Sequence, residues 1–376
     1  MRLGGNEYSV REAAGAFGDL GTLVPFAVGY ITIAGLEPQG VLLGFGLVAI
    51  ATGLYFRTPM PVQPMKAIAT TAIANPQIFT PAAIWMSALV TGALWLAMAL
   101  TGAVSWVAAL TARPVARGLV LGLGLTFMVE GIRLMQGSVA LALVGLVLTF
   151  VMLGQRRLPA MVGLLLYGSA AALLRDPTLA ADLSALSPVL RVPSVGLPAV
   201  TWNDLIQGAV LLALPQAALT LGNAVIATAE EHNALFSDRP VTVRRLALDH
   251  ALMNFGAAAV GGVPMCRGAG GMAGHIRFGA RTGGALVMLG MVLCTVGLFF
   301  ADSVSTLFRL FPMPILGVIL FFGGLELAAG VSNEGFSHEE RVVLAVTAAF
   351  ALWNMGLGYL AGLIVYHAWR RGLVSL

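Results

Sequence analysis

A single lysine is the residue of this sequence with the clearest chemistry. Of the 21 Lys and Arg residues in the 376-residue chain, Lys66 is the one lysine, and it follows prolines at 59, 61 and 64 in the apolar stretch 58–74. An ammonium at membrane depth costs about 2.5 kcal/mol or more, so it indicates a functional site. Because proline disrupts a helix interior, we expect an unwound stretch and then a short helix with Lys66 in its first turn. Such a helix start favours an anion.

Arg267 occupies a matching place about 200 residues later. The run Pro-Met-Cys-Arg at 264–267 resembles Pro-Met-Lys at 64–66, and each run stands at a short, broken apolar segment. Paired broken segments in two halves of opposite orientation are the best sequence indication of a transporter binding site. We therefore expect an inverted repeat in which the two short helices begin near mid-membrane, with their N-termini facing each other.

Residues beside the two cations supply hydrogen-bond donors. Gly268, Ala269 and Gly270 directly follow Arg267, and we expect their backbone N–H groups to contact the ligand, since glycine permits close approach to the backbone. Gln63 has an amide that can either donate to an oxyanion or cap the short helix.

Polar residues in two other apolar segments are further candidates. Asp19 needs a partner if it is buried; we expect that partner to be Lys66, so that Asp19 tunes the site or carries protons. Thr22 is expected to contact the substrate directly. Gln216 and Asn223 lie at i and i+7 on one helix face, and they are expected to bind the substrate or to hydrogen-bond between helices.

The composition places these residues in a membrane protein. The chain is 58% hydrophobic and 10% charged, with a mean hydropathy of +0.89, whereas soluble domains carry roughly 25% charged residues. The net charge of +4 reflects loop arginines and not nucleic-acid binding. The two cysteines give no disulfide framework. No histidine has metal-ligand spacing and no constellation indicates an enzyme, so we expect no metal and no cofactor.

The apolar runs number about fourteen. Placing the N-terminus in the cytoplasm puts most loop arginines, and both termini, on the cytoplasmic side. The third and tenth runs are too short to cross about 30 Å of hydrocarbon as plain helices, so we expect them to be half-helices. The predicted segments are 13–34, 40–56, 62–75, 81–110, 114–132, 138–154, 159–174, 204–229, 246–262, 266–277, 283–301, 312–330, 341–353 and 356–369.

Four blocks of the sequence resemble a known family. They are Phe17-Gly-Asp-Leu-Gly-Thr22, Pro61-Val-Gln-Pro-Met-Lys66, Leu214-Pro-Gln216 with Asn223, and Pro264-Met-Cys-Arg-Gly-Ala-Gly-Gly271. They look like the signature blocks of the molybdate transporter family, a branch related to sulfate permeases, and the resemblance extends over both halves.

This resemblance implies an all-α polytopic membrane protein with a seven-plus-seven transmembrane inverted repeat, shared with sulfate and uracil-type permeases. A mobile core domain would comprise 13–110, with segments 1–4, and 204–305, with segments 8–11. A gate domain would comprise 112–175, with segments 5–7, and 306–371, with segments 12–14, and would form a homodimer contact. An extracytoplasmic connection would occupy 176–203.

The predicted function is transport of a tetrahedral divalent oxyanion by alternating access, in a bacterial cytoplasmic membrane. Molybdate is favoured, with sulfate or tungstate as alternatives because their shape and charge are alike. A dianion would be nearly neutralised at such a site. Lys66 and Arg267 contribute one positive charge each and two helix N-termini contribute roughly +0.5 each, while Asp19 subtracts one charge. A nucleobase permease on the same fold is the other alternative, although uracil-type permeases carry a glutamate in the segment where this chain has Gln216.

Overall fold

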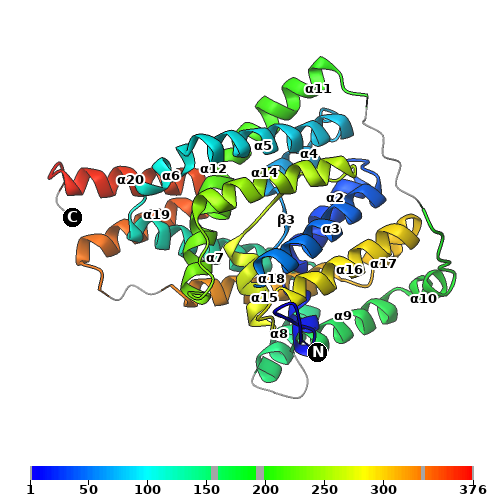
Figure 1. Cartoon of the computed structure of the whole chain (residues 1–376). Coiled ribbons are helices and arrows are strands. Elements are labelled where there is room, and N and C mark those ends of the chain that lie inside the picture. Colours follow the sequence, from blue (N-terminus) through cyan, green and yellow to red (C-terminus); the bar gives the residue numbers. More distant parts are fainter. Residues whose placement is uncertain (1, 154–159, 192–198, 332–334, 375–376) are drawn as a thin grey trace.

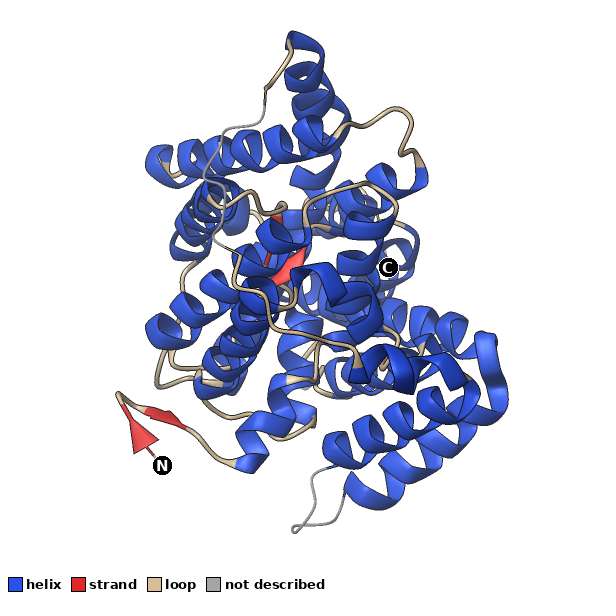
Figure 2. Cartoon of the chain, turned by 90° about the vertical axis from the view of Figure 1, so that its right-hand side faces the viewer, coloured by secondary structure: helices blue, strands red, loops and turns tan. Residues whose placement is uncertain are grey.

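The computed structural model describes residues 2–153, 160–191, 199–331 and 335–374, and these residues are mostly helical (Figure 1). Two short strand pairs interrupt the helices, one at the N-terminus and one in the interior (Figure 2). In chain order the elements are β1 (Arg2–Leu3), β2 (Asn6–Glu7), α1 (Val10–Ala16), α2 (Leu20–Thr32), α3 (Pro38–Phe56), β3 (Gln63–Pro64), α4 (Lys66–Ala74), α5 (Pro81–Thr101), α6 (Ala103–Ala109), α7 (Arg113–Met135), η1 (Gln136–Ser138), α8 (Val139–Leu153), α9 (Ala160–Arg175), α10 (Pro177–Ser184), α11 (Trp202–Ile206), η2 (Gln207–Ala213), α12 (Leu214–Leu219), η3 (Thr220–Ala227), α13 (Thr228–Leu235), α14 (Val243–Ala259), β4 (Met265–Cys266), α15 (Ala269–Arg277), α16 (Gly284–Phe299), η4 (Ala301–Ser303), α17 (Val304–Phe308), α18 (Met313–Ala329), α19 (His338–Trp353) and α20 (Met355–Arg370).

Each predicted apolar segment coincides with a helix, a bent run of helices, or a strand followed by a short helix. Among the described residues, α3, α5 and the stretch Arg113–Leu153 are long and apolar enough to cross a membrane without a sharp bend. Three further candidates are bent, by 48° between α1 and α2, by 47° within Trp202–Leu235 and by 97° between α16 and Ala301–Phe308.

The packing of the helices repeats between the two halves of the chain. In the repeat, α3 of the first half corresponds to α14 of the second, and α5 corresponds to α16. The contact of α3 with α16 is then equivalent to the contact of α14 with α5, and both contacts are present. α7 packs on α18, its own counterpart, and the contacts of α19 with α7 and α20 mirror those of α8 with α18 and α9. The predicted inverted repeat is therefore confirmed by the arrangement of the helices.

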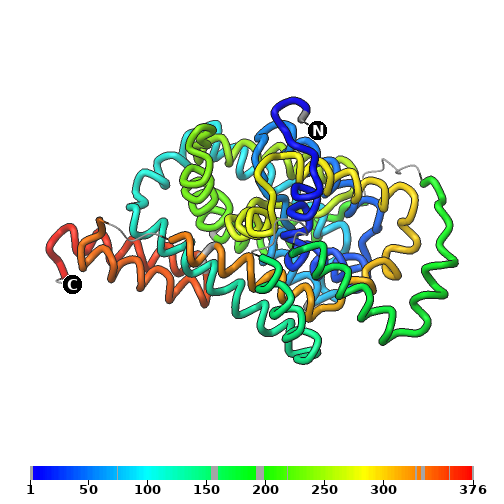
Figure 3. The backbone as a smooth tube through the Cα atoms, turned by 90° about the horizontal axis from the view of Figure 1, so that it is seen from below, coloured from blue at the N-terminus to red at the C-terminus, as the bar shows by residue number. Residues whose placement is uncertain are grey.

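The two groups of helices are visible in Figures 1 and 3, where α19 and α20 extend together away from the strand-containing centre. One group contains α7, α8, α9, α18, α19 and α20, and the other contains α2, α3, α4, α5, α12, α14 and α16, with α15 lying between α1 and α18.

Glycines bring α7 and α18 into very close contact. A Cβ on Gly131 would lie 2.7 Å from the carbonyl oxygen of Gly317, and a Cβ on Gly317 would lie 2.6 Å from that of Gly131. Gly124 and Gly324 form a second reciprocal pair of this kind. Small residues of this kind let helix backbones approach in lipid, where packing and not the hydrophobic effect drives association.

The centre of the molecule contains the two broken segments. β3 pairs antiparallel with β4, with Gln63 opposite Cys266 and Pro64 opposite Met265. Each strand leads into a nine-residue helix, α4 or α15. Nine residues span about 13 Å, less than half of a hydrocarbon core of about 30 Å. The two predicted half-helices are therefore confirmed, and the antiparallel strands make them run in opposite directions.

The outer surface of the molecule is apolar where a bilayer would cover it. On α8, Leu143, Val147 and Val151 are 55%, 62% and 63% exposed and stand four residues apart on one face. Such a stripe would be unfavourable in water but is expected beside lipid or a second apolar surface.

The predicted polar connection 176–203 is only partly loop. It contains α10, which follows directly after α9, and Arg309 binds the carboxylates of Asp176 and Asp182 at this end of the molecule. Hydrogen bonding to Arg309 lowers the pKa of Asp176 to about 2. Residues 192–198 of the connection lie outside the described residues.

Candidate functional site

The site begins with the start of α4, which follows Pro64 of the preceding strand β3. Met65 is the N-cap, in an extended conformation, and its side chain makes no capping hydrogen bond. The backbone N–H of Ala67 donates instead to the side-chain oxygen of Gln216, at 2.8 Å. The helix start therefore has a neutral amide from α12 as one cap, and the side chain of Lys66 extends from its first residue.

Lys66 lines a cavity of about 620 Å³. Its ammonium lies 3.7 Å from the ring centroid of Phe127, and it forms no salt bridge with any described residue. Thr22 and Thr70 line the same cavity from α2 and α4. A half-buried cation that faces a cavity and forms no salt bridge is positioned to bind an anion. The full lining is Gly21, Thr22, Pro25, Phe26, Lys66, Thr70, Ile73, Thr126, Phe127, Glu130, Arg133, Leu134 and Leu320.

Asp19 and Lys66 form no salt bridge, although the two charges attract each other, as expected from the sequence. Asp19 lies between α1 and α2, and both of its carboxylate oxygens accept from the Nε2 amide of Gln63, at 2.9 and 2.8 Å. Gln63 is fully buried on β3, and its oxygen Oε1 has no protein partner. Strand β3 therefore places Gln63 next to Asp19, at the break between α1 and α2, whereas Lys66 is the first residue of α4. In this structure the amide N–H groups of Gln63 are therefore used by Asp19.

The glycines of the α15 start make room for this carboxylate–amide pair. A Cβ on Gly268 would lie 2.2 Å from Oε1 of Gln63, and a Cβ on Gly271 would lie 2.6 Å from a carboxylate oxygen of Asp19. The close approach explains why small residues follow Arg267. Gly268, Ala269 and Gly270 do form the start of the second half-helix, as predicted.

Arg267 is not in the cavity that Lys66 lines. Its guanidinium is 1% exposed and binds Asp249 of α14 through Nε, at 2.7 Å, and Nη2, at 2.9 Å, while Nη1 donates to the carbonyl of Pro61 at 3.0 Å. Asp249 neutralises the cation that the sequence analysis assigned to the ligand. In the structure, Arg267 thus connects α14 to the chain beside the paired strands β3 and β4.

Of the two polar residues expected on one face of the eighth segment, Gln216 hydrogen-bonds to the half-helix α4, whereas the structure describes no such hydrogen bond for Asn223. Gln216 bonds Ala67 through its oxygen and Thr220 through its nitrogen, at 3.0 Å. Asn223 is 3% exposed, and its side-chain oxygen has no protein partner. The hydroxyl of Thr22 is also buried without a protein partner. The cavity lining includes Thr22 but not Gln216 or Asn223.

Two residues at the site were missed by sequence reasoning. Phe127 is one phenylalanine in an apolar helix, and nothing in its sequence surroundings distinguishes it. Asp249 is a carboxylate within the predicted apolar segment 246–262, and a search for a partner of Arg267 among the acids inside such segments would have found it. The described residues hold no cluster of three metal-ligating side chains.

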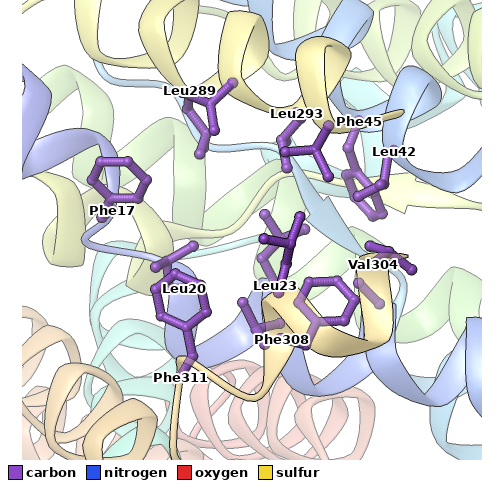
Figure 4. A pocket seen from close by; sticks show the side chains of 15 residues that line it. Phe17, Leu20, Leu23, Leu42, Phe45, Leu289, Leu293, Val304, Phe308 and Phe311 are labelled. Atoms are coloured by element: carbon purple, nitrogen blue, oxygen red, sulfur yellow. The ribbon is translucent and has the colours of Figure 1, made fainter. Parts of the chain in front are cut away.

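A second cavity, of about 90 Å³, is not suited to an anion. Phe17, Leu20, Phe45, Leu289 and Phe308 are among its apolar lining residues, which face one another with only carbon atoms in view (Figure 4). It offers no charge and no hydrogen-bond donor, so it is a void within apolar packing.

Two ion pairs bind α7 to α13 and α18 to α15, at the opposite end of these helices from the Lys66 cavity. Arg117 of α7 binds Glu230 of α13 at 3.0 Å, and Arg277 of α15 binds Glu326 of α18 at 3.0 Å. The cavity instead reaches the exposed Arg133, which lies sixteen residues, or about 24 Å along α7, from Arg117. The space between the two groups is thus open at the α4 end and bridged at the α15 end.

Comparisons with known proteins agree with this geometry. A family model described as "Molybdate transporter of MFS superfamily" matches residues 11–127 and 208–327, which include both half-helices. The chain belongs to the molybdate transporter family. The resemblance stated from the sequence blocks is thereby confirmed, and the chain is an integral membrane protein of a transporter family.

Relatives in this family cover nearly the whole chain. It is 31% identical to "Molybdate transporter 2" of Arabidopsis thaliana, over 94% of this chain and 86% of that protein. It is 29% identical to "Molybdate transporter 1" of the same plant, over 94% of this chain and 87% of that protein.

Solved anion-transporter structures share the fold of this family member. The transmembrane domain of the cyanobacterial bicarbonate transporter BicA matches with a TM-score of 0.58 and 16% identity, over 94% of this chain and 97% of that one. Murine Slc26a9 in its inward-facing state matches with a TM-score of 0.66 and 12% identity, over 100% of this chain and 70% of that one. These similarities confirm the predicted fold class.

Proposed function

We propose that this protein transports molybdate across a membrane, and that Lys66 supplies the main side-chain charge for the anion. The observation that carries the proposal is that Lys66 is the first residue of a half-helix, lines a cavity of about 620 Å³ and forms no salt bridge with a described residue. A tetrahedral dianion requires positive charge and N–H donors. The start of α4, facing the start of α15, supplies both.

The remaining candidate residues take two kinds of role in this proposal. Thr22 contacts the anion through its hydroxyl, and Ala269 and Gly270 offer backbone N–H groups from α15. Asn223 has a free side-chain oxygen, so it would reach the anion only through its amide nitrogen. The residues that position the site are Gln63, which holds Asp19, Gln216, which caps α4, Gly268, which admits the side chain of Gln63, and Arg267, which anchors the strand crossing.

The charge of the site is lower than the sequence suggested. With Arg267 neutralised by Asp249, Lys66 and two helix N-termini contribute about +2 in total, and Asp19 offsets one unit. A dianion is then incompletely balanced. Asp19 therefore tunes the site through Gln63, and proton uptake by Asp19 during transport would complete the charge balance.

Alternating access would arise from movement between the two helix groups. We assign the core domain to 13–110 and 204–305 and the gate domain to 112–175 and 306–371. The half-helices then belong to the core, and the cavity lies between core and gate. Opening of the bridged end requires the ion pairs Arg117–Glu230 and Arg277–Glu326 to separate, because each joins the core to the gate.

The arrangement in the membrane follows from the arginine distribution. With both termini in the cytoplasm, the cavity at the α4 end opens outward and the ion pairs close the cytoplasmic end. We propose a cytoplasmic membrane of a bacterial type and a homodimer through the gate domain, whose α8 exposes the apolar stripe described above. The family is one of transporters, and we assign no catalytic step to the chain.

Uptake into proteoliposomes tests the function. Purified protein should accumulate labelled molybdate, and Lys66→Met should reduce uptake and binding while leaving the thermal unfolding temperature near that of the parent. Empty liposomes and an Ile73→Val variant, altered at the same cavity without charge change, are the controls. Retention of parental molybdate binding by Lys66→Met would contradict the proposed site.

Competition assays separate the alternative substrates. Excess sulfate or tungstate should reduce molybdate uptake, since each is a tetrahedral dianion, and the order of their inhibition constants gives the selectivity. Uracil should not compete, because the cavity carboxylate Glu130 is exposed and lies beside Arg133, while Asp19 is held by Gln63. Competition by uracil alone would favour the nucleobase alternative.

A further inference from the structure

Phe127 lies between the starts of the two half-helices. It belongs to α7, is 4% exposed, and its ring centroid is 3.7 Å from Nζ of Lys66. The ring also packs on the first turn of α15, where a Cβ on Gly270 would lie 2.4–2.9 Å from three ring atoms. One ring thus contacts both elements that the proposed function assigns to the anion.

The electrostatics of the ring oppose an anion at this place. The face of an aromatic ring carries negative charge density, which attracts an ammonium. The same face repels an oxyanion. While the ring covers Lys66, it adds to the electrostatic attraction that Asp19 and Glu130 exert on the ammonium, and the anion cannot reach Nζ from that side.

We propose that Phe127 occupies the anion site when it is empty and that molybdate binds by displacing its ring from Lys66. Phe127 is on this account a specificity-determining residue: an entering ligand must hold Lys66 more strongly than the ring does. A dianion meets this requirement because charge-assisted contacts are stronger than neutral ones, whereas a neutral solute does not. The inference rests on the proposed function, since it takes Lys66 as the anion ligand.

The ring also couples the site to the gate domain. Its backbone is fixed closely to α18, where a Cβ on Gly324 would lie 2.8 Å from Cβ of Phe127. Lys66 and Gly270 are on the half-helices, so displacement of the ring changes a contact across the boundary between the two helix groups. Anion binding then releases a core–gate contact, which is what alternating access requires.

Fluorination of the ring tests the competition directly. Full-length protein carrying 4-fluoro-, 3,5-difluoro- or 3,4,5-trifluorophenylalanine at position 127 keeps the ring's shape but progressively weakens its attraction for a cation. Molybdate affinity, measured by calorimetry on purified protein, should rise with each fluorine. Complete loss of the cation–π contact corresponds to roughly two- to thirty-fold tighter binding. Phe127→Leu should give a tightening in the same range.

Phe26 provides a matched control, because it lines the same cavity but has no ring contact with a cation among the described residues. The same fluorinated series at Phe26 should leave molybdate affinity unchanged. A ¹⁹F resonance from 4-fluorophenylalanine at position 127 should shift when molybdate is added, and the resonance at Phe26 should shift less.

The outcomes distinguish this inference from the proposed function. If Lys66→Met weakens molybdate binding but affinity is flat across the fluorinated series at position 127, the displacement of Phe127 is overturned and the function of Lys66 stands. If Lys66→Met binds molybdate like the parent, both fail. A rise in affinity with fluorine that disappears in Lys66→Met supports the proposal, because a purely structural role of the ring would not depend on the ammonium.

Discussion

Removal of the Arg267 guanidinium should damage the fold more than it damages the anion site. Arg267 is 1% exposed and forms a bidentate salt bridge with Asp249. It also donates to the carbonyl of Pro61 at 3.0 Å, just ahead of the strand that leads to Lys66. Arg267→Met keeps much of the apolar volume but leaves a carboxylate and a carbonyl without their donor.

The magnitude follows from this burial. Removing one partner of a buried ion pair costs about 3–5 kcal/mol, because it leaves an uncompensated charge in a region of low dielectric constant. The side chain of Asp249 is 16% exposed, so partial hydration places the expected cost near the lower end. Against a total stability of about 5–15 kcal/mol, this is a large loss, and the unfolding temperature should fall markedly.

The double change Arg267→Met with Asp249→Leu provides the decisive comparison. Replacing both charges by apolar groups should restore most of the lost stability, since neither side chain is left charged and unpaired. Thermal unfolding in detergent and molybdate calorimetry would be measured on the parent, both single variants and the double variant. We expect the double variant to bind molybdate within a few-fold of the parent.

The reasoning would be refuted by one pattern of results. If Arg267→Met unfolds at the parental temperature but loses molybdate binding, and the double variant also fails to bind, then Arg267 is a ligand of the anion and its pairing with Asp249 is secondary.

Three further predictions concern other parts of the molecule. Lys66→Met should weaken molybdate binding roughly ten- to a hundred-fold, corresponding to the ~1.5–3 kcal/mol of one charged hydrogen bond, and calorimetry would show this without a change in the unfolding temperature. Glu326→Gln should weaken the pair with Arg277 and make a cysteine placed at the α15 end more reactive toward a water-soluble maleimide; unchanged labelling would contradict a bridged end. Gly131→Leu should prevent α7 and α18 from packing, because its side chain would meet the backbone at Gly317, and the loss of folded protein in size-exclusion chromatography would show it, whereas Gly137→Ala should be tolerated.

Much of the architecture was predictable from the sequence because the membrane restricts what a chain can do. Backbone polar groups in lipid must bond within the segment, so apolar runs indicate helices. Prolines at 59, 61 and 64 forbid a regular helix there, and the structure has β3 followed by α4. The matching break near residue 264 then revealed the repeat. The family could be recognised because its blocks coincide with these breaks.

The partners of the charged residues were decided by the tertiary structure. Whether Asp19 meets Lys66 or Gln63 depends on which residue of an extended strand faces the break between α1 and α2, and a sequence without regular periodicity there does not indicate this. Whether Arg267 faces the ligand or Asp249 depends on the crossing of α14 with β4. A side chain as long as arginine can reach either.

The sequence by itself determined that a cation stands at a half-helix start within the membrane, because composition and proline placement are local properties. Only the tertiary structure decided that Lys66 forms no salt bridge with a described residue, that Arg267 is neutralised, and that Phe127 covers the ammonium. Each of these depends on contacts between segments far apart in the chain. The physical reason is that the energy of a buried charge depends on what surrounds it within a few ångströms, and those surroundings come from the packing of different helices.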